Sequence, residues 1–253
     1  MTKYSIKASN LCTISTTLIF IALWQVIYSF KLLPVFMLPS PAQVLCAFIK
    51  DVKVLAINSL TTLNEAFLGI TISIILSFIV SALMDRFTFL YQMIYPIIIV
   101  SQTIPTVAIA PILILWLGYD IAPKVVLIVM SCFFPIAVGL IEGFKTADKD
   151  MINLLKAMGA SKWQIFKYIK LPVSMPSFFS GLKIAASYSI ISAVVSEWLG
   201  GYSGLGVYMI RAKKAYAFDK MFAALIIISL ISLALVKAVC IVKKYFIAWD
   251  KNN

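Results

Sequence analysis

The stretch NLLKAMGASKWQIFKYIKLP, residues 153–172, forms a basic, amphipathic segment between two long apolar ones. Apolar side chains recur across its beginning with the spacing i, i+3, i+4, i+7: Met151, Leu154, Leu155 and Met158. This spacing places them on one side of a helix, and the polar residues Lys149, Asn153 and Lys156 fall on the opposite side. We therefore predict a short helix that buries one side.

A turn and a second helix are predicted to follow. Gly159 stands where a left-handed residue commonly ends a helix, and Ser161 with Gln164 has the spacing of a capping box. The second helix would turn three apolar residues inward and three lysines outward: Ile165, Phe166, Ile169, Lys162, Lys167 and Lys170. It should end near Leu171, because Pro172 disfavours helical geometry at the residue before it.

The composition is that of an integral membrane protein. Of the 253 residues, 62% are hydrophobic, whereas soluble domains are about 45–50% apolar. The net charge of +12 comes from short Lys and Arg runs between apolar segments, so it indicates membrane topology and anionic lipid headgroups rather than nucleic acid. Histidine is absent and the four cysteines lack ligand-like spacing, so we expect no metal site and no thiol catalysis.

Six apolar segments are long enough to be predicted as membrane spans: residues 11–30, 60–83, 87–117, 124–141, 173–196 and 221–241. Between the first two, Ser40, Pro41 and Gln43 provide the N-cap, N1 and N3 positions of an amphipathic helix at the membrane interface. The predicted apolar stripe of that helix is Leu45, Phe48, Ile49 and Val52. The third segment contains Pro96, Pro105 and Pro111, so we expect it to be bent and packed centrally.

Polar residues within these spans are candidates for a substrate path. A polar run lies at the expected bend, and the fifth span carries further polar groups; the candidates are Gln102, Thr103, Tyr188 and Ser192. Hydrogen bonding between helices is the alternative role. In the fifth span, Lys183 is expected to extend its ammonium to the headgroups, and Glu197, beside Trp198, is expected to have a structural role at an interfacial span end.

The energy source must lie outside the chain if it pumps a solute. No G-x-x-x-x-G-K-[ST] phosphate-binding loop is present. The acidic residues Glu65, Asp85, Glu142 and Glu197 are placed at or near predicted span ends, which argues against a proton relay through the membrane. No nucleophile with a base is visible, so we expect no catalytic residue and a transporter rather than an enzyme.

The spacing Gly159, nine residues, Ile169, one residue, Leu171, Pro172 resembles the cytoplasmic E-A-A motif of permease subunits in ATP-binding-cassette (ABC) importers. Asn153, Leu154 and Leu155 stand where that motif has Glu-Ala-Ala. The resemblance implies one all-α permease domain over residues 1–253, with the six-span type I importer fold and a cytoplasmic coupling hairpin at 146–172. The residues that it assigns to ATPase coupling are Asn153, Leu154, Leu155, Met158, Gly159, Ala160, Ser161, Ile169, Leu171 and Pro172.

Three further stretches resemble the permeases of sulfonate, taurine, nitrate and thiamine-precursor importers: LPSPAQV (38–44), IPTVAIAPILILWLGYD (104–120) and EWLGGYSGLGVYM (197–209). The last is most similar to permeases associated with hydroxymethylpyrimidine. The resemblance implies a separate ABC ATPase subunit that holds ATP and Mg, an extracytoplasmic substrate-binding protein and a second permease copy. It places the chain in a bacterial plasma membrane with both termini cytoplasmic. Arg211, Lys213, Lys214 and Lys220 then lie outside, which conflicts with the rule that basic residues are enriched on the cytoplasmic side.

Two alternatives remain open. The cargo could be a sulfonate, taurine or nitrate. From another class, the chain could be a secondary carrier or a channel, which its polar bend and Lys183 would suit. In that case residues 153–172 would be an ordinary amphipathic surface hairpin.

Overall fold

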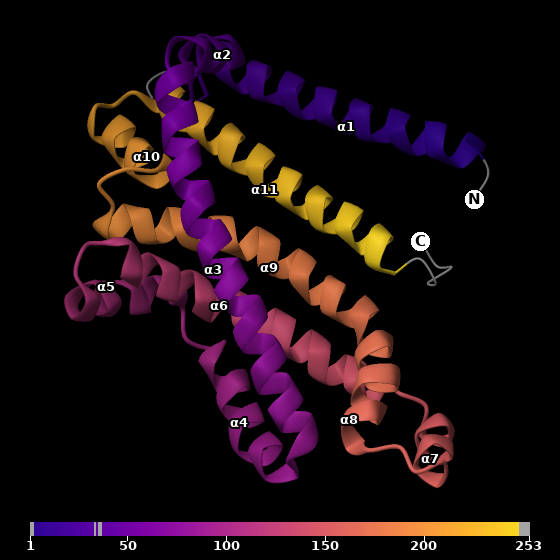
Figure 1. Ribbon diagram of the computed structural model, residues 1–253. Coiled ribbons are helices and arrows are strands. Elements are labelled where there is room, and N and C mark those ends of the chain that lie inside the picture. The colour runs from indigo at the N-terminus through magenta and orange to yellow at the C-terminus, as the bar shows by residue number, and fades with distance from the viewer. Residues whose placement is uncertain (1–2, 33, 35–36, 248–253) are drawn as a thin grey trace. The chain divides into compact units, whose positions relative to one another are not determined.

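A computed structural model describes residues 3–32, 34 and 37–247, with side chains from residue 15 onward. The described residues form helices and no strands (Figure 1). The helices are α1 (Lys3–Ser29), α2 (Pro41–Lys50), α3 (Val52–Arg86), α4 (Thr88–Ser101), α5 (Thr106–Leu117), α6 (Ile121–Lys145), α7 (Lys149–Ala157), α8 (Lys162–Ile165), α9 (Leu171–Gly200), α10 (Leu205–Lys214) and α11 (Phe218–Phe246).

The chain folds as two compact units. The first unit comprises Met1–Ile57 and Tyr208–Ile227, and the second comprises Asn58–Val207 and Ile228–Asn253. In the described residues, four helices are long and apolar enough to cross a membrane, namely α3, α6, the continuous helix Lys162–Gly200 and α11. The bent pair α4 and α5 makes a fifth if it counts as one span. The prediction of a helical, multi-pass chain is confirmed. The number of six spans stays a prediction, because the first predicted span begins at residue 11 and side chains are described only from residue 15.

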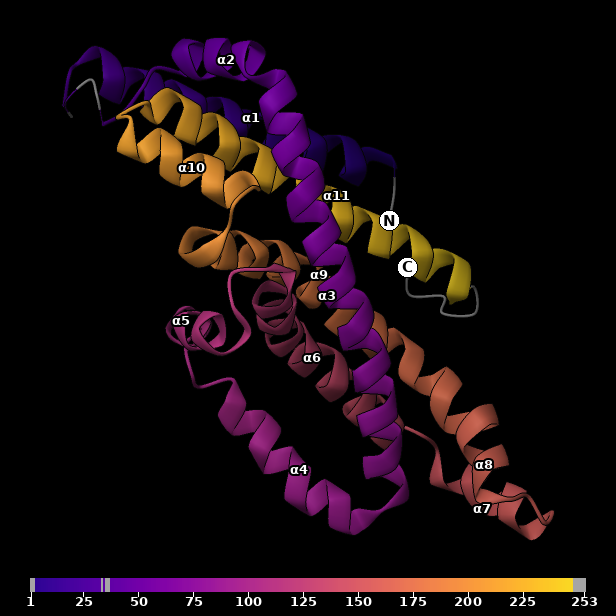
Figure 2. The same ribbon diagram turned by 60° about the vertical axis from the view of Figure 1, so that its left-hand side comes forward.

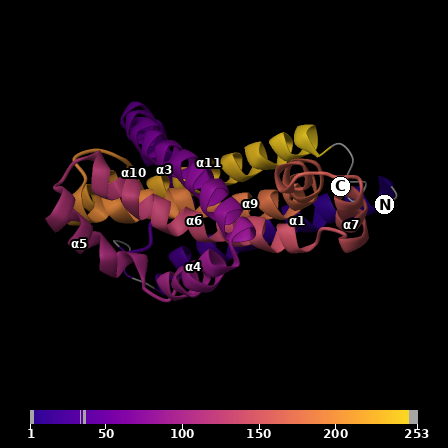
Figure 3. The ribbon, with the colours of Figure 1, turned by 60° about the horizontal axis from the view of Figure 1, so that its bottom comes forward.

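The core of the second unit is the close pairing of α6 and α9, which lie side by side (Figure 3). Gly139 and Gly143 of α6 face the backbone of α9: a Cβ added to Gly139 would come within 2.7 Å of the Ser177 carbonyl oxygen. From the other side, a Cβ on Gly181 would collide with the Pro135 carbonyl. Small residues at this spacing let membrane helices approach closely.

The predicted bend of the third span is confirmed. α4 and α5 meet at 102°, and the break between them comprises residues 102–105, ending at Pro105 (Figure 2). Pro96 and Pro111 lie inside the two helices. The expected central packing is not seen for much of the segment, since Leu115 is 82% and Trp116 75% exposed in the isolated chain.

The helix after residue 40 begins as predicted but packs on a different face. Ser40 and Gln43 form the capping box, with the Gln43 N–H donating to Ser40 Oγ over 3.2 Å. Val44 and Ala47 are the buried residues, whereas Leu45 and Ile49 of the predicted stripe are exposed. Small Ala47 lies in a cluster that includes Ala223 and the rings of Trp24, Phe48 and Phe222. Contact with Trp24, Phe222 and Ala223, which are distant in sequence, selects the buried face.

The prediction that the second helix of the hairpin ends near Leu171 is wrong. A π-helical turn, Phe166–Lys170, joins α8 to α9, and the Leu171 N–H donates to the carbonyl of Phe166, five residues earlier. A widened turn relieves the clash that a proline ring makes with the preceding turn of a regular α-helix. Pro172 therefore sits in the first turn of α9, and the helix continues to Gly200.

Candidate coupling hairpin and substrate path

The turn of the hairpin has the geometry that its sequence predicts. Gly159 has φ +81°, its N–H donates to the Lys156 carbonyl, and the Ala160 N–H donates to the Leu155 carbonyl over 2.9 Å. These two bonds form a Schellman motif, which requires a left-handed residue at the position of Gly159. The helix–turn–helix shape follows from these local bonds.

The second arm of the hairpin is fixed to the membrane helices. Ile165 and Ile169 are buried, and the ring of Phe166 packs against Phe144 at 5.3 Å between centroids. Lys170, predicted to point outward, instead donates to both carboxylate oxygens of Asp85 at 2.6 and 2.9 Å. This ion pair ties the π-helical turn to the end of α3.

The first arm is different, because α7 has no buried residue. Met151, Leu154 and Met158 are 56%, 62% and 73% exposed, so the prediction that this helix buries one side is wrong for the isolated chain. Asn153 is also exposed, and Leu155 is half-buried. Three of the four stripe residues are therefore exposed, on a helix joined to an arm whose own apolar residues Ile165 and Ile169 are buried.

Removing the cap of α8 should loosen this arm locally. Ser161 Oγ accepts from the Gln164 N–H, and Gln164 Oε1 accepts from the Ser161 N–H. For Ser161→Ala we expect a loss of about 1 kcal/mol of local helix stability. The measurement is amide hydrogen exchange around Trp163, with Ser180→Ala in α9 as the control. Unaltered protection around Trp163 would contradict the role of the cap.

Of the four candidate path residues, two lie in one depression and the other two lie apart from it and from each other. Gln102 and Tyr188 line one depression of about 580 Å³ in the second unit, together with Ser177, Ser180 and Lys243. Thr103 is exposed and donates to the Val100 carbonyl over 2.8 Å. Ser192 is buried and donates to Ser131 of α6 over 2.8 Å. The structure thus gives Ser192 the alternative role, a hydrogen bond between helices.

A buried ionic cluster was missed by the reasoning from sequence. Glu197 lies near the end of α9, where the span was predicted to end, but its side chain is only 1% exposed and is held inside the protein. Its Oε1 accepts from Thr62 Oγ1 at 2.7 Å and its Oε2 accepts from the Gly206 N–H. Nearby, the Lys124 ammonium contacts buried Glu65 at 2.5 Å. The general expectation that charges within spans pair with one another was the signal available in the sequence.

The glycines after Glu197 make room for its carboxylate. Gly204 has φ +117°, and a Cβ there would overlap the Glu197 carboxyl group. Leu205 donates its N–H to Thr62 Oγ1 over 3.0 Å, and the Gly204 N–H donates to Asn58 Oδ1 over 2.8 Å. The segment EWLGGYSGLG therefore wraps around a buried carboxylate and fastens the loop after α9 to α3.

Within the first unit, Asp51 accepts hydrogen bonds from Lys220 at 2.7 Å and from the Tyr208 hydroxyl at 2.8 Å. The Lys220 bond, followed by the Tyr208 bond, lowers the pKa of Asp51 below its ordinary value of 3.8. Burial, followed by the bond to Asp51, raises the pKa of Tyr208, so its hydroxyl remains a donor. The charged carboxylate thus links the end of α2 to α10 and α11.

Because the folded pKa of Asp51 is lowered, its stabilising contribution is complete above the ordinary value of 3.8. It is lost as the pH falls through the lower folded value. We expect Asp51→Asn to destabilise the protein at neutral pH, and the difference from wild type to shrink as the pH falls below about 4. Unfolding followed at several pH values measures this difference; one that does not change with pH would contradict the assignment.

The comparisons with known proteins agree with this architecture. Residues 69–247 match the family model described as binding-protein-dependent transport system inner membrane component. A solved structure titled as an amino acid ABC transporter with histidines superposes with a TM-score of 0.65 at 16% identity, covering 79% of this chain and 97% of that chain. The likeness to that structure concerns the fold. The chain belongs to the family of binding-protein-dependent transport permeases.

Two relatives are similar over most of their length. A probable ABC transporter permease protein of Haemophilus influenzae is 34% identical, with 86% of this chain and 89% of the relative covered. The formylaminopyrimidine transport permease protein of Halalkalibacterium halodurans is 35% identical, with 86% and 88% covered. Lower identities, 29%, 27% and 24%, relate the chain to permeases named for riboflavin in Chloroflexus aurantiacus, aliphatic sulfonates in Bacillus subtilis and taurine in Escherichia coli. The chain is the membrane permease subunit of an ABC importer.

Proposed function

We propose that this permease imports a thiamine-precursor pyrimidine, hydroxymethylpyrimidine or its formylamino analogue. The observation that supports this choice of cargo is the 35% identity, over 219 residues, to a relative named for formylaminopyrimidine. The depression beside Gln102 and Tyr188 supports it. An amide and a phenol suit a flat, polar heteroaromatic ring, because they offer hydrogen bonding beside an aromatic surface.

The energy would come from a separate ATPase that docks on α7. This partner is inferred from the hairpin, where Met151, Leu154 and Met158 are exposed although α8 and the π-helical turn are anchored. An exposed apolar stripe on a helix next to an anchored arm is a suitable surface for a partner groove. ATP and Mg would be bound by that subunit, substrate would be delivered by an extracytoplasmic binding protein, and a second permease copy would complete the path. In this arrangement both termini and the hairpin lie on the cytoplasmic side of the plasma membrane.

The cargo is tested by ATP hydrolysis in lipid nanodiscs that contain the permease, its ATPase and its binding protein. We expect hydroxymethylpyrimidine or formylaminopyrimidine to stimulate hydrolysis, and taurine, an aliphatic sulfonate, nitrate and riboflavin to leave it unchanged. Tyr188→Ala should weaken the stimulation, whereas Tyr202→Ala, on the exposed loop after α9, should not. Stimulation by a sulfonate or by riboflavin would overturn the pyrimidine assignment.

A further inference from the structure

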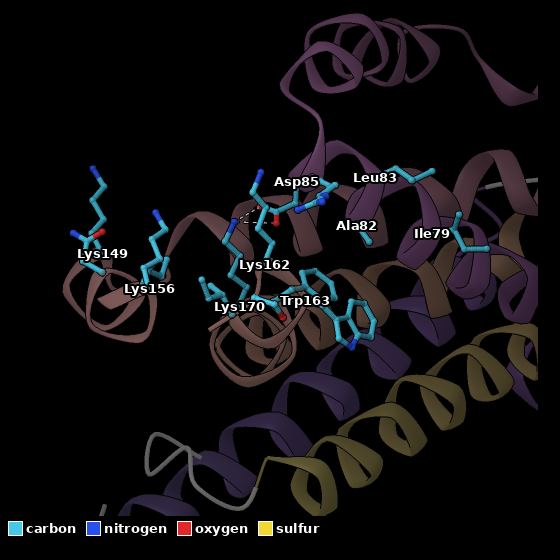
Figure 4. Close-up of a pocket in the computed structure, with 15 residues that line it drawn as sticks. Ile79, Ala82, Leu83, Asp85, Lys149, Lys156, Lys162, Trp163 and Lys170 are labelled. Atoms are coloured by element: carbon cyan, nitrogen blue, oxygen red, sulfur yellow. Dashed lines mark hydrogen bonds and ion pairs between the residues drawn. The ribbon is translucent and has the colours of Figure 1, made fainter. Parts of the chain in front are cut away.

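A large basic cavity lies in the second unit, between the end of α3 and the hairpin. Its volume is about 1320 Å³. Figure 4 shows Lys149 and Lys156 on α7 at one side, Ile79 and Leu83 on α3 at the other, and Lys162 and Trp163 between them. Two residues of the predicted coupling set, Asn153 and Ser161, line the cavity, but the exposed apolar stripe of α7 and the candidate substrate path do not.

The charges of the cavity are unbalanced. Its lining carries five cations, Arg86, Lys149, Lys156, Lys162 and Lys170, but the carboxylate of Asp85 is the one acidic group. Asp85 is paired with Lys170 at 2.6 Å. Among the described residues, no carboxylate lies within 4.0 Å of the other four cations. The cavity is therefore suited to an anion.

The apolar wall narrows the choice of anion. Ile79 and Leu83 are exposed and lie in the last two turns of α3, a helix that is apolar enough to span a membrane. Trp163 is 68% exposed beside them, and its ring stacks on Phe166 at 5.7 Å between centroids. The lining runs from apolar residues through a tryptophan to cations. A lipid leaflet has the same order, from acyl chain through interface to phosphate.

We propose that this cavity binds an anionic phospholipid. The phosphate lies among Arg86, Lys149, Lys156 and Lys162, and an acyl chain follows Ile79 and Leu83 along α3. An acyl chain would cover the exposed Ile79 and Leu83 as well as place its phosphate near the cations, whereas a free phosphate would contact the cations alone. Basic pockets at the ends of membrane helices are known to select anionic headgroups.

The test is native mass spectrometry of the full-length permease after extraction from bilayers of phosphatidylglycerol and phosphatidylcholine in equal amounts. We expect wild type to retain phosphatidylglycerol, and the quadruple variant Arg86→Gln, Lys149→Gln, Lys156→Gln, Lys162→Gln to retain about tenfold less. The matched control changes four exposed lysines outside the cavity, Lys50, Lys53, Lys213 and Lys214, to Gln and should retain the wild-type amount. All eight substituted residues are exposed, so thermal unfolding in detergent should be unchanged in both variants.

Three results would overturn the proposal. Equal lipid loss in the pocket and control variants would mean that net charge alone holds the lipid. Displacement of phosphatidylglycerol by millimolar inorganic phosphate or glycerol phosphate would assign the cavity to a free phosphate group. Wild-type lipid retention in the pocket variant, together with lost co-purification of the ATPase, would make the cavity part of the ATPase interface.

Discussion

Glu65→Gln should be among the most destabilising single substitutions in this protein. Glu65 and Lys124 are 3% and 7% exposed, and their side chains meet at 2.5 Å. Removing the carboxylate would leave the Lys124 ammonium buried without its partner. Breaking a buried ion pair in this way costs about 3–5 kcal/mol, because the remaining charge has been taken out of water.

The control for Glu65→Gln is the same substitution at an exposed pair. Glu142 contacts Lys145 at 2.9 Å, but their side chains are 52% and 51% exposed. Glu142→Gln should therefore change the free energy of unfolding by no more than about 1 kcal/mol. Denaturant titration of the two variants in the same detergent gives the comparison. Equal effects at the two sites would contradict the structural importance of the buried cluster.

A double variant separates a lost charge pair from lost packing. Lys124→Met combined with Glu65→Leu removes both charges and keeps side chains of similar size. We expect it to recover most of the stability lost in Glu65→Gln, since replacing both members of a buried pair by apolar groups is often neutral. A double variant as unstable as the single one would show that the packing, not the unpaired charge, is responsible.

Leu154→Asp combined with Met158→Asp should abolish binding of the ATPase without unfolding the permease. Both side chains are exposed in the isolated chain, so the substitutions remove no internal contact that buries them. If the two side chains anchor α7 in a partner groove, charges there should weaken co-purification by about tenfold or more. The measurement is the amount of ATPase that co-purifies with each variant from the same co-expression.

Tyr202→Asp provides the matched control, because Tyr202 is exposed and belongs to the loop after α9 rather than to the hairpin. It should leave co-purification unchanged. Gly159→Val adds a second variant, since a β-branched residue at φ +81° strains the turn that orients α7. Normal ATPase recovery with both hairpin variants would contradict the docking role.

The sequence predicted those features that depend on local chemistry, in the hairpin and elsewhere. The turn at Gly159 and the capping boxes at Ser40 and Ser161 were predicted correctly, because each is set by a few neighbouring residues. The bend before Pro105 was predicted for the same reason. The coupling role of the hairpin and the substrate path are still predictions.

Features that depend on distant contacts were predicted less well. The continuation through Pro172 needs a π-helical turn, which is tied to α3 by the Lys170–Asp85 pair. Burial of Glu197 depends on Thr62, which lies 135 residues away in the sequence. From the sequence alone, a carboxylate at a span end beside a tryptophan resembles an interfacial residue. Its burial becomes evident only when the fold places Thr62 and the Gly206 N–H against it.

ATP-driven uptake in proteoliposomes tests the central claim most directly. The liposomes would contain the permease and its ATPase, with the binding protein and labelled hydroxymethylpyrimidine on one side and ATP on the other. The importer account predicts uptake that requires ATP and is lost in the Leu154→Asp, Met158→Asp variant. Uptake driven by an ion gradient without ATP, and unaffected by that variant, would contradict it and favour a secondary carrier.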